Sequence, residues 1–107
     1  MNIVIKIMPE YECYPIWISE NGGIFENINP RELKISEILK NQIENWDSKF
    51  EKTYNKKNPI NSGFNNKNQE IAFEKEGVII QENLVKELND YNIIYVPTFN
   101  SSQSPDF

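Results

Sequence analysis

The spacing of the apolar residues changes twice along this 107-residue chain, and these changes limit the folds open to it. Apolar residues alternate with others in "NIVIKIMP" and "YPIWIS", recur every three or four positions in two long segments, and alternate again in "YNIIYVP". Alternation predicts strands and the longer spacing predicts helices. The element order is therefore β-β-β-α-α-β. We expect an α+β fold with a single antiparallel or mixed four-stranded sheet and two helices packed on one face.

The stretch "YPIWISENGGIFENI" predicts a hairpin of two strands, residues 14–19 and 24–28. Asn21-Gly22 between them tolerates the positive φ values of a tight turn. A two-residue loop pairs Trp17 with Glu26. A three-residue loop that includes Gly23 shifts the pairing by one residue and moves Phe25 to the other face. The sequence leaves both registers open.

Two apolar stripes predict the helices. Ser36 is expected to cap the first helix, after a short helical turn at residues 29–32. The second helix is expected from about residue 69 to 89, and Gly77 within it costs about 1 kcal/mol. A close approach by the first helix or by Trp17 would explain that glycine. The stripes are Ile35, Leu39, Ile43, Trp46, Phe50 and Tyr54, then Phe73, Gly77, Ile80, Leu84 and Leu88.

The remaining segments complete one domain, residues 1–97. Residues 55–69 predict a long loop, with Phe64 at the edge of the core. The last strand, residues 91–97, is expected beside the first, and both suit central positions because they are apolar on both faces. Residues 98–107 predict a flexible C-terminal tail. We assign Trp17, Trp46 and Phe73 to the core, although the strand face of Trp17 could point away from the helices.

The totals predict a cytoplasmic protein with a basic partner. The net charge is −5, which disfavours nucleic acid and membrane surfaces and favours cationic proteins. Cys13 is the single cysteine, so no disulfide can form within the chain, and a reducing compartment is expected. The N-terminus is too short and polar for a signal peptide, and no apolar run reaches the ~20 residues of a membrane helix.

Candidate catalytic and metal-binding residues are missing from the sequence. The chain has no histidine, which excludes the usual general base and the Ser-His-Asp and Cys-His arrangements. Cys13 lies beside acidic residues that disfavour its thiolate, so we expect a passive thiol. No glycine-rich phosphate loop or calcium loop is present. The chain is therefore predicted to have no cofactor, no metal and no enzymatic activity, and a hydrolase using paired carboxylates ranks last.

Two surfaces are candidates for binding a partner. An acidic row on the first helix, formed by Glu37, Glu44 and Glu51 with Asp47, is either a solvated face or a rim that meets a basic protein. The stripe Ile71, Val78 and Val85 on the second helix is either covered by the loop or sheet edge, or forms a contact or homodimer seam. Polar contacts are expected from the hairpin tip and the long loop. The predicted partner-binding residues are Glu37, Glu44, Asp47, Glu51, Glu20, Asn21, Asn61, Asn65 and Asn66.

Several segments resemble a known family. "MPEYECYPIWISENGGIFENINPREL", "NSGF" and "EIAFEKEG", followed by "IIYV", are similar to small acidic bacterial proteins. These resemble the immunity proteins encoded beside polymorphic or contact-dependent growth-inhibition toxins, and the likeness extends to Val96. It implies a cytoplasmic bacterial protein that binds a cognate toxin C-terminal domain, in many cases a basic nuclease, and occludes its active site. It supplies no catalytic or interface residues. The alternative is a non-catalytic protein-binding or homodimeric structural module without a toxin partner.

Overall fold

The computed structural model of the chain describes residues 2–97, and the predicted order β-β-β-α-α-β is confirmed. The predicted tail, residues 98–107, lies outside the described residues. The elements are β1 (Ile3–Ile7), β2 (Ile16–Glu20), β3 (Glu26–Ile28), the 3-10 turn η1 (Pro30–Glu32), α1 (Glu37–Glu51), the 3-10 turn η2 (Pro59–Asn61), α2 (Lys67–Glu87) and β4 (Asn92–Tyr95).

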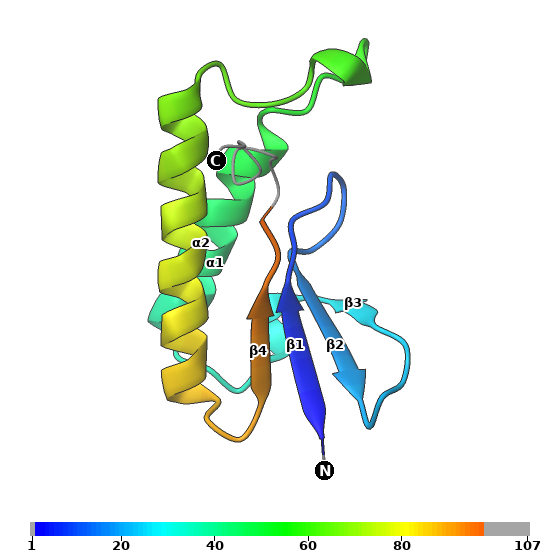
Figure 1. The fold of residues 1–107 in the computed structure, drawn as a ribbon, viewed down its shortest axis with the longest axis vertical. Helices are drawn as coiled ribbons and strands as arrows, with labels where there is room; N and C mark the ends of the chain where they lie inside the picture. The colour runs from blue at the N-terminus through cyan, green and yellow to red at the C-terminus, as the bar shows by residue number, and fades with distance from the viewer. Residues whose placement is uncertain (1, 98–107) are drawn as a thin grey trace, which may run out of the picture.

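The four strands form one mixed sheet in the order β3-β2-β1-β4 (Figure 1). β1 is antiparallel to β2 and parallel to β4, and β2 is antiparallel to β3. The prediction that the last strand lies beside the first is confirmed. The central position expected for β4 is wrong, because β4 is an edge strand. Its apolar residues divide instead: Ile93 is buried beneath the helices and Ile94, on the other face, is 42% exposed.

Both helices pack on one face of the sheet, as predicted. Ile5 and Ile7 of β1 share this face with Ile16 of β2 and Ile93 of β4, because paired residues point to the same side. These four join the inward residues of α1 and α2 in one core that contains Ile43, Trp46, Phe73, Ile80 and Leu84. Among residues 2–97, no element covers the opposite face of the sheet (Figure 1).

The hairpin adopts the register of the three-residue loop. Asn21 and Gly22 have φ values of 52° and 79°, and the Gly23 amide donates to the Glu20 carbonyl oxygen at 2.9 Å. Gly23 is therefore the third residue of the loop, and Trp17 pairs with Asn27 rather than with Glu26. Only this register aligns Ile16 with Ile28 on the helix-covered face.

Trp17 lies on the face of β2 that the helices do not cover. The core assignment of Trp17 is therefore wrong, because β2 must point Ile16 and Ile18 inward and its alternate residues outward. The assignments of Trp46 and Phe73 are confirmed, at 0% and 3% exposed, with their rings stacked at 4.5 Å between centroids.

Side-chain caps set the starts of the two helices. The Ser36 Oγ atom accepts a hydrogen bond from the Leu39 amide at 3.2 Å, as the sequence predicts for α1. α2 begins two residues earlier than expected because the Asn66 side chain caps it. The carboxylate of Glu87, at the end of α2, accepts hydrogen bonds from the Ser36 amide and hydroxyl at 2.6 and 2.7 Å. This contact joins the end of α2 to the start of α1.

Gly77 has no room for a side chain. A Cβ atom there would lie 2.6 Å from Cε1 and 2.8 Å from the hydroxyl oxygen of Tyr95. The expectation of a large neighbouring group is right, but the neighbour is Tyr95 rather than α1 or Trp17. The Tyr95 hydroxyl donates a hydrogen bond to Glu74. Burial, followed by this carboxylate, raises the pKa of Tyr95.

Candidate partner-binding surfaces

Arg31 pairs with two of the four carboxylates in the acidic row on α1. It follows Pro30 in η1, which packs beside α1, and its guanidinium reaches Glu44 at 2.8 Å and Glu37 at 2.5 Å. The hydrogen bond from Arg31 lowers the pKa of Glu37, and the same pairs raise the pKa of Arg31. Glu37 and Glu44 are therefore partnered within the fold and contribute less free charge than the sequence suggests.

Glu51 has a second kind of partner. Both of its carboxylate oxygens accept a hydrogen bond from the Glu12 backbone amide, each at 3.1 Å. Glu12 lies in the β1–β2 connection and has a φ of 63°, so the carboxylate holds an unusual backbone conformation against α1. Glu51 is thus partly structural.

Asp47 differs from the other acidic residues of the row. Its Oδ1 atom is buried and has no hydrogen-bond partner within residues 2–97. Burial raises the pKa of Asp47 to about 7, with a smaller contribution from the charge of Glu51. Buried carboxylate oxygens nearly always have a donor, so Asp47 is the acid of this row whose hydrogen bonding is least complete within residues 2–97.

Asp47 lies where two small adjoining hollows meet. One, of about 350 Å³, is lined by Glu12, Cys13, Tyr14, Asn27, Asp47 and Glu51. The other, of about 330 Å³, adds Pro15, Asn29, Pro30, Glu44 and Ser48. We call this surface the acidic notch and define it by Glu12, Glu44, Asp47 and Glu51. Tyr14, which lines both hollows, is 47% exposed.

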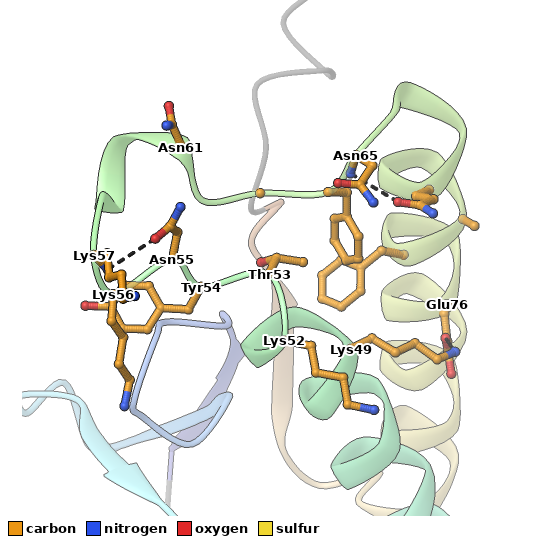
Figure 2. A pocket seen from close by; sticks show the side chains of 15 residues that line it. Lys49, Lys52, Thr53, Tyr54, Asn55, Lys56, Lys57, Asn61, Asn65 and Glu76 are labelled. Atoms are coloured by element: carbon orange, nitrogen blue, oxygen red, sulfur yellow. Dashed lines mark hydrogen bonds and ion pairs between the residues drawn. The ribbon is translucent and has the colours of Figure 1, made fainter.

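A larger hollow of about 930 Å³ lies between the end of α1, residues 52–65 and the first turns of α2 (Figure 2). We call it the basic hollow because Lys49, Lys52, Lys56 and Lys57 line it against a single acid, Glu76. These lysines are not among the partner-binding residues predicted from the sequence. A signal was present, because residues 52–69 contain four lysines and no acidic residue in an otherwise acidic chain.

The uncovered face of the sheet presents an aromatic cluster. The Lys6 Nζ atom lies 4.4 Å from the ring centroid of Phe25 and 6.0 Å from that of Trp17. The Trp17 indole nitrogen donates to the Met8 carbonyl oxygen at 2.9 Å. Trp17 is therefore anchored beside β1, with its polar atom satisfied.

The outer face of α2 presents an apolar stripe. Ile71 and Val78 are each 41% exposed and Val85 is 47% exposed, so neither the loop nor the sheet edge within residues 2–97 covers them. Ile79, beside Val78, is 47% exposed. Within residues 2–97 the structure does not show the cover that the first interpretation of this stripe expects, and the contact or homodimer seam stays a prediction.

A comparison with known protein families matches residues 3–98 to the Serratia CdiI immunity protein-like family. The chain belongs to this family. The match confirms the predicted resemblance to the immunity proteins of contact-dependent growth inhibition. A comparison with curated proteins finds no match.

This member of the CdiI-like family distributes its predicted partner-binding residues over three places. The acidic row lies along α1, the hairpin tip with Glu20 and Asn21 lies at one end of the molecule, and the long loop lies at the other (Figure 1). Asn21 Oδ1 accepts from the Asn2 amide at 3.0 Å, so this side chain holds the N-terminal segment. The nine residues therefore do not form one site.

The loop asparagines have different roles. Asn66 accepts a hydrogen bond from the Gln69 amide at 2.9 Å and caps α2. The Asn65 amide donates to Gln69 Oε1 at 3.1 Å, while the side chains of Asn61 and Asn65 line the basic hollow. Within residues 2–97, no group of histidine, cysteine and acidic side chains is arranged to hold a metal ion. Across the same residues, neither helix has the length and apolar character needed to span a bilayer.

Proposed function

We propose that this CdiI-like protein is an immunity protein that binds the C-terminal toxin domain encoded beside it and occludes that domain's active site. The match to the immunity family over residues 3–98 carries the proposal. The net charge of −5 supports a basic toxin, of which nucleases are the commonest expectation, because an acidic inhibitor is steered towards a cationic cleft. The protein acts in the bacterial cytoplasm as a binding partner, with no catalytic role of its own.

We place the main contact at the acidic notch. A lysine or arginine side chain of the toxin entering the notch would place a positive charge beside Asp47, whose buried Oδ1 atom has no donor within residues 2–97. A cation there also offsets the burial that raises the pKa of Asp47, so binding should lower that pKa and release a proton near pH 7. Glu44 and Glu51 flank the position and add long-range attraction.

The other predicted residues play smaller parts in this proposal. Glu37 is occupied by Arg31 and Glu20 lies on the hairpin, so both add to the acidic field rather than to the notch. Asn21 and Asn66 have structural hydrogen bonds. The side chains of Asn61 and Asn65 add polar contacts only if the toxin extends over the loop.

Co-expression with the toxin domain tests the proposal. Cells that express the neighbouring gene's C-terminal domain should survive with the wild-type protein and die with Asp47→Lys, which places a cation in the notch. Asp90→Lys, the same charge reversal on an exposed residue after α2, should still protect. Equal death with and without the wild-type protein would overturn the immunity role. Equal protection by Asp47→Lys would move the interface elsewhere.

A homodimeric module is the second candidate, favoured by the stripe on α2. Lys75 and Glu82 interleave with Ile71, Val78 and Val85 at spacings of four and three residues, so all five share one helix face. An antiparallel second copy crossing near Val78 would bring Lys75 of each chain to Glu82 of the other and bury the apolar residues. The charges of this stripe are thus self-complementary.

A further inference from the structure

The basic hollow has the size of a small-molecule site. Its volume of about 930 Å³ falls at the upper end of the range of roughly 300–1,000 Å³ typical of ligand pockets. The last turn of α1, the connection after it and the first turns of α2 form its walls (Figure 2). Neither the family match nor the proposed toxin contact at the notch assigns a role to it.

The charges lining the hollow are positive and only partly neutralised. Lys49 pairs with Glu76 at 2.9 Å, and Lys56 pairs with Glu12 of the notch at 3.5 Å. Lys52 and Lys57 form no ion pair within residues 2–97. Unpaired lysines gathered in an acidic protein attract an anion to this place rather than to the surface in general.

The amide side chains of the hollow present donors. Asn55 Oδ1 accepts from the amides of Lys57 and Asn58 at 3.1 and 3.0 Å, which leaves its NH₂ group available. Gln69 Oε1 accepts a hydrogen bond from the Asn65 amide, so the NH₂ group of Gln69 is likewise available as a donor. A lysine ammonium group can only donate hydrogen bonds. The lysines and the two available NH₂ groups therefore match a ligand whose polar groups accept hydrogen bonds.

Flat aromatic surface adjoins these donors. Tyr54 lines the hollow, and Tyr11 covers one side of its ring at 4.6 Å between centroids. Phe64 and Phe73, which also line it, lie 5.1 Å apart. Aromatic rings beside positive charge bind the base and the phosphate of a nucleotide together.

We propose that the basic hollow binds a mononucleotide, with its base against Tyr54 and its phosphate at Lys57, which lies beside Tyr54, while Lys52 adds attraction from farther along the hollow (Figure 2). A phosphate carries a charge of roughly −1.5 to −2 and three acceptor oxygens, which suits several donors better than one carboxylate does. A nucleic-acid strand fits less well, because its further phosphates would meet the acidic remainder of the surface. The proposal is independent of the immunity role.

Titration of the wild-type protein tests it. With AMP as the probe, backbone amide resonances of residues 52–57 and 63–69 should shift saturably at low ionic strength. Adenosine and inorganic phosphate should each bind at least about tenfold more weakly, since each makes only half of the contacts. The affinity should fall as salt is added, because the phosphate contact is ionic.

Variants locate the site. Lys52→Ala with Lys57→Ala should weaken AMP binding about tenfold or more, whereas Lys34→Ala with Lys86→Ala, a matched loss of two exposed lysines elsewhere, should leave it unchanged. Tyr54→Leu should weaken AMP more than phosphate. The amide spectrum of each variant shows whether it is folded, and an unfolded variant is replaced by Lys52→Gln with Lys57→Gln.

Four results would overturn the proposal. They are no saturable shift below about 10 mM AMP, equal affinity for AMP and phosphate, tighter binding of a single-stranded hexanucleotide than of AMP, and equal or tighter binding of a hexaglutamate peptide. The third would assign the hollow to nucleic acid and the fourth to an acidic protein segment. Each can occur whether or not the protein protects cells from the toxin, so the two proposals fail separately.

Discussion

Replacing Gly77 with alanine tests how the second helix fits against the sheet. Taken alone, the change should stabilise α2 by about 1 kcal/mol, because glycine is a poor helix former. The new Cβ atom would lie 2.6–2.8 Å from the ring of Tyr95, however, where ordinary contact begins at 3.4 Å. The ring must therefore move by nearly 1 Å, away from Glu74 and Trp46, at a typical overpacking cost of about 1–3 kcal/mol.

We expect Gly77→Ala to lower the free energy of unfolding by about 1 kcal/mol, measured by urea denaturation, and the melting temperature by roughly 4–8 °C. In a Tyr95→Ala background the same change should stabilise the protein by up to about 1 kcal/mol, because the obstacle is gone. Tyr95→Phe is the matched control. It keeps the ring and removes the hydroxyl, so most of the coupling should remain. An identical effect of Gly77→Ala in all three backgrounds would refute the reasoning.

Three further predictions concern charge, capping and association. The wild type should lose stability as the pH rises from about 4 to about 7, because the raised pKa of Asp47 makes the folded state bind this proton more tightly, and Asp47→Asn should remove that loss. After solvent screening, Asp47→Asn should be more stable than the wild type at pH 8 by an amount on the order of 1–2 kcal/mol. Equal pH profiles of denaturation for the two proteins would contradict this prediction. Ser36→Ala should cost about 1 kcal/mol, and Ser36→Thr much less, in the same denaturation assay, since only alanine removes the cap. Val78→Asp should abolish any dimer seen by light scattering, with Asn68→Asp on the same helix as the control; a dimer that survives would exclude the α2 seam.

The element types could be predicted from the sequence because each has its own period. Ile5 and Ile7 alternate on β1, and Ile43, Trp46 and Phe50 recur at helical spacing, so local patterns sufficed to give the α+β order and the face that the helices cover. The edge position of β4 was not predictable in this way. Apolar residues on both faces of a strand can mark a central strand or an edge strand with one exposed residue, and only the tertiary pairing decides.

The candidate site was harder to predict, because the state of a charge depends on its partners. Glu37 and Asp47 belong to the same acidic row, yet Arg31 occupies one while the other lacks a donor within residues 2–97. Arg31 reaches the row from a turn that precedes α1, a geometry that no spacing rule gives. The residue types are enough to predict that the surface is negatively charged. Which of its charges remain unpaired depends on the fold.

The contact of Glu87 with Ser36 has a consequence for how this protein could diversify. It ties the last turn of α2 to the first turn of α1, so the connection between the helices does not need to hold them together. Doubling the length of such a loop costs only about 0.6 kcal/mol in closure entropy. Members of the family should therefore be able to exchange or lengthen residues 53–65 while retaining the same helix pair. The loop end is where we expect new binding properties to evolve at the least risk to folding.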